Sequence, residues 1–353
     1  MTIKIGKKNI SKTSNPFIIA EAGINHNGDI NIAKKMIVAA KVAGCDAVKF
    51  QTFKASEFCG DPQQMFTYTS QGKEVTESML GMFSRYEFTR EQWQELKDYC
   101  DESSICFLST PQNVSDLDLL LSIGIDAIKV GSDDFTNIPL LKEYKKANLP
   151  MILSCGMANL ADVYNALEAI DAIHDTSAEV ILCLCTSQYP TPPNDVNLNK
   201  LHTLESAFPN TIKGFSDHTQ GPLASSLAVA LGAVVFEKHF TLDNNYPGPD
   251  HWFSENPESL KHWCQSIRTA HTMLGSSIVA PTKSEQEMKN LARRSVVALK
   301  DIKNGELLTI DNIGLRRPGN GLPPSTFDKI VGLKATKNIL KAGLIEFGDF
   351  SNV

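Results

Sequence analysis

Two histidines stand at the ends of two consecutive apolar segments of this chain, and each has an acidic residue within two positions. His218 follows Asp217, and His239 comes two residues after Glu237. A single histidine is more often a hydrogen-bonded packing residue, whereas two imidazoles side by side are typical of a divalent-metal site. With only two nitrogen ligands, water and substrate oxygens must complete the coordination. Such an open site suits Mn²⁺, Co²⁺ or Mg²⁺ acting as a Lewis acid better than a closed structural zinc site.

Two lysines, Lys49 and Lys129, are charged residues near the ends of otherwise apolar segments. Each lysine by itself is compatible with a charge that reaches solvent or with a surface ion pair. Hydroxyl side chains end comparable segments at Thr110, Ser132, Ser154 and Ser216. Together the ammonium and hydroxyl groups suit an anion that carries phosphate and carboxylate. The chain lacks the G-x-x-x-x-G-K-[ST] and strand-linked G-x-G-x-x-G patterns, so a small phosphorylated acid is favoured over a nucleotide.

Three further positions carry charges that allow both a structural and a functional interpretation. Glu21 ends an apolar segment. There it either forms a structural ion pair or acts as a general acid or base. Asp250 lies in a loop rich in proline and glycine, where it either caps the turn or binds sugar hydroxyls. Arg316 and Arg317 adjoin the turn Pro-Gly-Asn-Gly, and they either face solvent or direct one guanidinium to a substrate carbonyl or carboxylate.

These residues follow a regular alternation of β-rich apolar segments and amphipathic helical patterns, which is typical of a parallel sheet built from βα units. The expected strands are Phe17–Gly23, Asp46–Thr52, Cys106–Thr110, Ala127–Ser132, Met151–Gly156, Val180–Ser187, Lys213–Thr219 and Val234–Phe240. The expected helices include Ile30–Ala43, Thr89–Glu102, Pro139–Ala147, Leu160–Ile173, Pro222–Leu231 and Pro257–Leu274.

Eight such strands predict a (β/α)₈ barrel, in which the carboxyl ends of all strands meet on one face. Residues more than two hundred positions apart, such as Glu21 and His239, then surround a single substrate. A doubly wound open sheet is the alternative fold, and it would separate these strand ends.

Length and composition set the remaining expectations. The 353 residues suit a barrel over 1–275, a linker over 276–293 and a small strand-rich domain over 294–353. The segment 53–88 is expected to be a long functional loop. A net charge of −6 without a basic stripe argues against nucleic acid, and the longest apolar stretch, 223–236, is too short for a membrane span. We expect a cytoplasmic protein whose eight cysteines are free thiols, with Cys183 and Cys185 in a structural role.

Nine segments in this order resemble the sialic acid synthase family: IIAEAGINHNGD, VKFQTF, FLSTP, IKVGS, CTSQYPTP, GFSDHT, FEKHFTLD, PGPDH and RRPGNG. The resemblance extends over nearly the whole chain. It implies a (β/α)₈ barrel followed by an antifreeze-like (SAF) domain, in a domain-swapped homodimer where that domain caps the partner's active site. It also implies condensation of phosphoenolpyruvate with an N-acylated amino sugar of the N-acetylmannosamine type.

The resemblance also implies roles for individual residues. His218 and His239 match the metal ligands. The phosphoenolpyruvate contacts are matched by Lys49, Thr110, Lys129, Ser132, Ser154 and Ser216. The family's residues around the sugar and the reacting atoms correspond to Glu21, Gln51, Tyr189, Glu237 and Asp250. Arg317 of the swapped domain corresponds to the arginine that contacts the N-acyl group. Ser187 replaces a common asparagine at a substrate-contact position, and Cys155 replaces a common threonine.

The implied reaction joins C3 of phosphoenolpyruvate to the aldehyde of the open-chain sugar, which a metal on His218 and His239 polarises. Water then adds to C2, and phosphate leaves by C–O cleavage. Lys49 and Lys129 act here by charge and position, with Glu21 moving the proton. Three alternatives stay open: an aldolase that forms a Schiff base on Lys129, a carbohydrate-binding protein without activity, and a related synthase that uses a sugar phosphate. A synthase of the pseudaminate type is a fourth.

Overall fold

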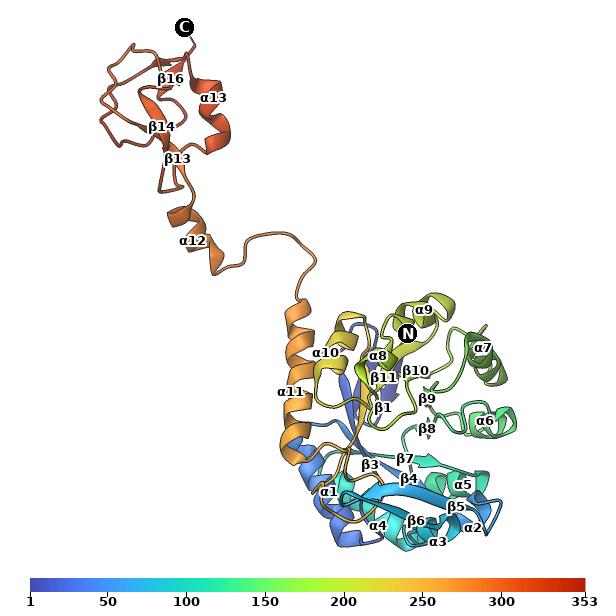
Figure 1. Cartoon of the computed structure of the whole chain (residues 1–353). Coiled ribbons are helices and arrows are strands. Elements are labelled where there is room, and N and C mark those ends of the chain that lie inside the picture. Colours follow the sequence, from blue (N-terminus) through green and yellow to red (C-terminus); the bar gives the residue numbers. More distant parts are fainter. Residues whose placement is uncertain (353) are drawn as a thin grey trace. The chain divides into compact units, whose positions relative to one another are not determined.

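The computed structural model describes residues 1–352, and the chain divides into two compact units, Met1–Gly275 and Ser276–Val353. The first unit contains eight parallel strands arranged in a ring (Figure 1). Their bounds are β3 Phe17–Gly23, β4 Ala47–Thr52, β7 Cys106–Pro111, β8 Ile128–Val130, β9 Met151–Ser154, β10 Val180–Cys185, β11 Ile212–Ser216 and β12 Val235–His239.

Each strand of the ring pairs with the strand that comes before or after it among these eight. The ladder runs β7-β4-β3-β12-β11-β10-β9-β8, and β7 lies beside β8, which closes the ring. This order confirms the predicted (β/α)₈ barrel, because a doubly wound sheet reverses its strand order near the middle. The open-sheet alternative is therefore wrong.

Helices surround the ring and follow from local signals in the sequence. In α1 (Ile30–Ala43), the Asp29 side chain accepts hydrogen bonds from the first-turn amides, and Gly44 ends the helix at a φ of 96°. The other outer helices are α4 Arg90–Glu102, α5 Val114–Ile123, α6 Ile138–Lys145, α7 Leu160–Ala169, α8 Pro193–Val196, α9 Lys200–Ala207, α10 Leu223–Ala230 and α11 Pro257–Leu274.

The barrel has one apolar core inside the ring and another between the ring and the helices. The inner core contains Ile19, Leu108 and Ile181, and it continues into the amino-terminal hairpin of β1 (Thr2–Ile5) and β2 (Lys8–Ser11). The lumen is therefore packed with apolar side chains at its amino end. Buried polar side chains gather at the carboxyl ends of the strands, so this face is the one expected to be chemically active.

The segment between β4 and β7 differs from the expected long loop, because it folds into regular elements. It contains α2 (Ala55–Phe58), a hairpin of β5 (Met65–Ser70) and β6 (Lys73–Ser78), and α3 (Met79–Ser84). The hairpin turns at Gln71 and Gly72, which both have positive φ angles. Ile24, Phe53, Met82 and Tyr86 form a small apolar cluster beneath it, separate from the barrel cores.

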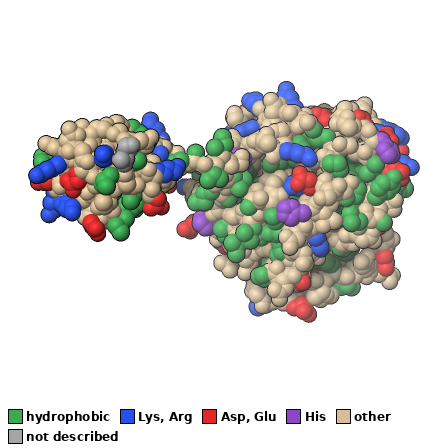
Figure 2. Space-filling model, turned by 90° about the horizontal axis from the view of Figure 1, so that it is seen from above, with side chains coloured by type: hydrophobic (Ala, Val, Ile, Leu, Met, Phe, Trp, Pro, Cys, Tyr) green, Lys and Arg blue, Asp and Glu red, His purple; other side chains and the backbone are tan. Residues whose placement is uncertain are grey.

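The second unit begins with the segment predicted as a linker, and this segment contains α12 (Glu285–Ala292). Short antiparallel pairs follow, together with a 3-10 turn and one short helix: β13 Ser295–Ala298, β14 Ile313–Arg316, η1 Pro324–Thr326, α13 Phe327–Ile330, β15 Lys334–Ala335 and β16 Phe350–Ser351. Its core includes Val296, Leu308, Ile313 and Ile345. In residues 1–352, no helix is long and apolar enough to cross a membrane. Figure 2 shows acidic and basic side chains interspersed on the face of each unit in view.

Candidate active site

Side chains from all eight barrel strands or the residues just after them meet at the carboxyl face. They line a cavity of about 390 Å³. The predicted residues that line it are Glu21, Lys49, Gln51, Thr110, Lys129, Ser132, Ser154, Ser187, Tyr189, Ser216, His218, Glu237 and His239. A larger cavity of about 580 Å³ adjoins it at Met157, Cys185 and Ser187, but neither of the two histidines and neither of the two barrel lysines lines that one.

A buried ion-pair cluster occupies the floor of the smaller cavity. Lys49 Nζ lies 2.7 Å from Glu21 Oε2 and donates to Thr110 Oγ1 at 3.1 Å. Gln51 Nε2 donates to the other Glu21 oxygen at 3.1 Å. Because at most a few per cent of either charged side chain is exposed, water screens this pair weakly. The pair therefore holds Lys49 near the carboxyl end of β4, where it lines the cavity.

Glu237 holds the second lysine of the cavity. Its Oε1 accepts from Ser216 Oγ at 3.1 Å and lies 3.5 Å from Lys129 Nζ and 3.8 Å from Lys49 Nζ. Lys129 Nζ also donates to Ser154 Oγ at 2.9 Å. Two ammonium groups thus share the Glu237 carboxylate, and Lys49 also pairs with Glu21, so the floor of the cavity holds two lysines and two carboxylates.

The two carboxylates differ in the direction of their pKa shifts. Burial raises the pKa of Glu21, and the charge of Lys49 only partly opposes this. Burial also acts to raise the pKa of Glu237, but the charges of Lys129 and Lys49 outweigh it, so the pKa falls. Carboxylates with opposite shifts in one pocket are suited to different proton-transfer roles.

Lys129 stays charged in this environment. Burial acts to lower its pKa, but the neighbouring Glu237 carboxylate outweighs that effect, so the pKa is raised. A Schiff base requires the neutral amine as nucleophile. The site therefore favours Lys129 as a fixed positive charge over Lys129 as a nucleophile.

The two histidines lie next to each other, with ring centroids 5.5 Å apart. His218 Nδ1 lies 2.7 Å from the Thr186 carbonyl, which can only accept, so this nitrogen carries a proton and Nε2 is left for a ligand. His239 Nδ1 is buried without a hydrogen bond. Burial, followed by the charges of His218 and Lys49, holds the pKa of His239 well below its usual value, which keeps the ring neutral.

This donor set fits a divalent cation. Besides the His239 nitrogen, Glu237 Oε2 is a buried oxygen without a hydrogen-bond partner, and neutral imidazole with carboxylate oxygen suits Mn²⁺. Residues 1–352 hold no group of three or more His, Cys, Asp or Glu side chains in metal-binding range. The sequence predicted a site with two protein nitrogens, in which water or substrate supplies the other ligands, and this ligand set stays a prediction.

A hydroxyl-lined recess opens beside Lys129 and Ser154. The Gly156 amide donates to Ser132 Oγ at 3.1 Å, and Ser187 Oγ has no partner. A Cβ at Gly156 would lie 2.5 Å from Ser187 Oγ and 2.6 Å from Ser132 Oγ, which is too close for any side chain. Glycine is therefore required here to keep the two hydroxyls close together. The two hydroxyls can donate the hydrogen bonds that an oxyanion accepts.

Two predicted residues do not line the cavity. Asp250 lies at its edge, with Oδ2 at 3.7 Å from His239 Nδ1, and burial raises the pKa of Asp250 to about 7. Arg317 belongs to the second unit, where it is exposed directly after β14.

Several cavity residues were not predicted from the sequence. Gln112 directly follows β7, but the predicted strand ended at Thr110, so Gln112 was not counted among the residues at the strand end. Cys185, expected to be structural, lines the cavity with its Sγ 3.8 Å from His218 Nδ1. An aromatic wall is formed by Phe53, Phe58, Phe66 and Phe83. The turn-forming pair Gln71–Gly72 between two β-rich stretches was the signal for the hairpin that carries Phe66.

Comparison with known proteins places this geometry among carbohydrate-forming enzymes. The model of the NeuB family matches residues 36–279, and that of the SAF domain matches residues 293–351. The N,N'-diacetyllegionaminic acid synthase of Campylobacter jejuni is 42% identical over 93% of this chain and 98% of its own length. An uncharacterized protein of Methanocaldococcus jannaschii is 40% identical over 98% of both chains.

A solved structure supports the same relationship. The N-acetylneuraminic acid synthetase of Leptospira borgpetersenii superposes with a TM-score of 0.72 at 32% identity, and the match covers 82% of this chain and 95% of that one. The likeness thus holds for both the sequence and the arrangement of the elements.

Proposed function

The chain belongs to the NeuB family and is a transferase that condenses phosphoenolpyruvate with a sugar, and from this premise we propose its substrate and the roles of its residues. The acceptor we propose is an open-chain N-acetylmannosamine-type sugar, and the products are a nonulosonic acid and phosphate. The relative that makes N,N'-diacetyllegionaminic acid supports a legionaminate-like product in particular. The observation that carries the proposal is the single cavity that holds two lysines, two carboxylates and two histidines.

Lys49 and Lys129 bind the phosphate and carboxylate of phosphoenolpyruvate in this proposal. Each ammonium group is fixed by a carboxylate and a hydroxyl, so it needs no reorganisation when the substrate arrives. Ser132, Ser187 and the Gly156 recess offer the remaining hydrogen bonds. The substrate is thereby held with its C3 carbon toward the histidines, the geometry that the condensation needs.

His218 and His239 would hold a divalent cation, with Mn²⁺ preferred over Co²⁺ or Mg²⁺. When bound, the cation supplies Lewis-acid polarisation of the sugar aldehyde. Glu21, bound to Lys49 and Gln51, is placed to hold or move a proton at the reacting atoms. Gln51, Tyr189 and Asp250 would contact the sugar. The eight free thiols support a reducing, cytoplasmic setting.

The experiment that tests this function measures phosphate release from phosphoenolpyruvate in Mn²⁺. N-acetylmannosamine and its 2,4-diacetamido-trideoxy analogue are supplied in parallel, and each product is identified by mass spectrometry. We expect release that requires one of these sugars and stops with a chelator. An altrose-type amino sugar and a phosphorylated aldose are supplied in two further assays. Release only with the altrose-type sugar would instead identify a pseudaminate-type synthase, and release only with the phosphorylated aldose would identify a sugar-phosphate synthase. Binding of phosphoenolpyruvate without release under any condition would favour a binding protein.

Substituting Gly156 by alanine tests the recess. The added Cβ would collide with Ser132 Oγ and Ser187 Oγ, so one hydroxyl must move away from the bound anion. We expect the KM for phosphoenolpyruvate to rise about 10-fold or more, as for the loss of one charge-assisted hydrogen bond, while the KM for the sugar changes little. Steady-state kinetics with each substrate varied in turn measures both values. Equal rises in both KM values would contradict a specific role in anion binding.

Arg317 is proposed to reach the N-acyl group from the partner subunit in a domain-swapped homodimer. Mixing inactive Lys129→Met subunits with Arg317→Ala subunits tests this arrangement. In heterodimers, the barrel of the second variant would receive an intact arginine from the first, so activity should recover to roughly a quarter of wild type after random exchange. Phosphate release before and after subunit exchange measures the recovery. If each second unit serves its own barrel, both sites of the heterodimer stay defective and no activity returns.

A further inference from the structure

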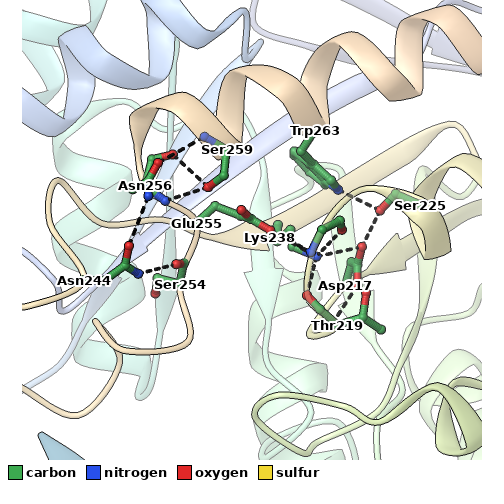
Figure 3. A network of polar contacts seen from close by, with 11 residues as sticks. Asp217, Thr219, Ser225, Lys238, Asn244, Ser254, Glu255, Asn256, Ser259 and Trp263 are labelled. Carbon is green, nitrogen blue, oxygen red and sulfur yellow. Dashed lines mark hydrogen bonds and ion pairs between the residues drawn. The ribbon is translucent and has the colours of Figure 1, made fainter. Parts of the chain in front are cut away.

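A buried charge cluster joins the carboxyl ends of β11 and β12 to α10 and α11 (Figure 3). Its centre is Lys238, whose side chain is 3% exposed. Lys238 Nζ lies 3.0 Å from Asp217 Oδ2 and donates to the carbonyls of Thr219 at 2.5 Å and Gly221 at 3.1 Å. An ammonium group has three protons, and here each has its own acceptor.

Asp217 is equally saturated. Its Oδ1 accepts from the amide and hydroxyl of Thr219 at 2.8 and 2.7 Å, and its Oδ2 accepts from Ser225 Oγ at 2.6 Å as well as facing Lys238. Ser225 Oγ in turn accepts from the indole nitrogen of Trp263 at 2.9 Å. The cluster therefore ties the ends of β11 and β12 to α10 and α11 through bonds with little freedom to rearrange.

A second acidic residue brings the loop after β12 into the same cluster. Glu255 Oε1 lies 3.7 Å from Lys238 Nζ and accepts from the Gly221 amide at 3.2 Å. The Glu255 backbone amide donates to the carbonyl of His239 at 2.9 Å. The backbone of one histidine is thus bonded directly to a member of the cluster.

The alternation of side chains along a strand links this cluster to the cavity. Asp217 stands between Ser216 and His218, which both line the cavity, and Lys238 stands between Glu237 and His239, which also line it. Successive residues of an extended chain point to opposite sides. The Asp217 amide donates to the Glu237 carbonyl at 2.8 Å, so the pairing of the two strands continues to this level. Any shift of Asp217 relative to Lys238 must shift the two histidines relative to each other.

We infer that Asp217, Lys238 and Glu255 are positioning residues that set the spacing and orientation of His218 and His239 for the cation. This inference rests on the proposed metal role of the histidines. Stability alone does not account for the cluster, because apolar residues often replace a buried ion pair without loss of stability. Partners one step removed from metal ligands, by contrast, commonly change metal affinity 10- to 100-fold when they are lost.

Lys238→Met is the main test, measured by Mn²⁺ titration of the full-length protein with electron paramagnetic resonance of the free ion and without substrates. We expect the Kd for Mn²⁺ to rise about 10- to 100-fold. The KM for phosphoenolpyruvate at saturating Mn²⁺ should change less than about threefold, because the lysines that bind it lie on β4 and β8. Asp217→Asn, which keeps the side-chain shape, should raise the Kd in the same direction and serves if the first variant does not fold.

Lys213→Met is the matched control. Lys213 is a buried lysine on the neighbouring strand β11, but it lies near the amino end of that strand and pairs with Glu205 at 2.6 Å. It should leave the Kd for Mn²⁺ within about twofold even if its melting temperature falls as far as that of Lys238→Met. Folded Lys238→Met or Asp217→Asn protein with the wild-type Kd overturns the inference, and so does an equal loss in Lys213→Met. If wild-type protein binds no Mn²⁺, the proposed metal role fails and the inference fails with it.

Discussion

Replacing Lys129 by methionine is expected to lower kcat/KM for phosphoenolpyruvate about 1,000-fold, which corresponds to about 4 kcal/mol of lost transition-state stabilisation. Two effects combine in this loss. The variant lacks the charge that binds the substrate anion, and it leaves the buried Glu237 carboxylate with Lys49 at 3.8 Å as its nearest ammonium group. Phosphate-release kinetics measures the change, and circular dichroism with thermal melting checks that the variant folds.

A chemical experiment separates this role of Lys129 from that of a nucleophile. Borohydride is added to wild-type protein with pyruvate or phosphoenolpyruvate, and the intact mass is compared with that of the Lys129→Met variant. Because Glu237 keeps Lys129 charged, we expect no covalent adduct. A reduced adduct mapped to Lys129 in wild type and missing in the variant would establish the aldolase mechanism instead.

Substitution of His218 by alanine is expected to reduce turnover by at least about 1,000-fold while the barrel stays folded, since the ring contributes to the site rather than to the main core. The variant removes the nitrogen that the Thr186 carbonyl orients at 2.7 Å. Mn²⁺ affinity, measured by calorimetry, should fall together with the rate. Chelation of the wild-type protein should abolish turnover, and added Mn²⁺ should restore it.

His262 provides a control for the His218 substitution. It is exposed on α11 and lies outside the cavity. His262→Ala should keep wild-type turnover and wild-type Mn²⁺ affinity, because an exposed side chain away from the site contributes little to either. Full activity of wild-type protein in chelator, or of His218→Ala in any buffer, would remove the cation from the mechanism.

The sequence predicts the barrel well because its signals are local and repeated. The strand Phe17–Gly23 and the helices Ile30–Ala43 and Pro257–Leu274 have the predicted bounds, since caps and turn residues flank clear apolar patterns. The helix Val114–Ile123 was missed because three consecutive leucines, Leu119 to Leu121, blur its period. The hairpin after β4 was missed because most residues of its two strands are exposed or half-buried, which weakens the alternation that identifies a strand.

The sequence could predict which residues line the site but not which of them contact one another. Strand ends converge in any barrel, so the lysines, carboxylates and histidines could be assigned to one face from the chain order alone. The sharing of Glu237 by Lys49 and Lys129 depends on the closure of the ring, which no local pattern specifies. The roles assigned to these residues stay predictions, as does the role of Arg317, whose place in the second unit does not say which barrel it serves.

We expect the hairpin of β5 and β6 to tolerate sequence change that the barrel strands do not. Phe66, on β5, lines the cavity, and the apolar cluster that supports the hairpin is separate from both barrel cores. The hairpin also binds the loop after β12, where Gly248 donates to Ser70 Oγ at 3.0 Å and Gln71 donates to the Asn245 carbonyl at 2.9 Å.

Substitutions in the hairpin and its apolar cluster, within residues 53–88, can therefore accumulate without disturbing the strands that carry the lysines and histidines. Selection for a new sugar can act on this segment while purifying selection preserves the condensation chemistry in the barrel. Chimeras that exchange residues 53–88 with a relative that makes a different product would test whether this segment sets the choice of sugar.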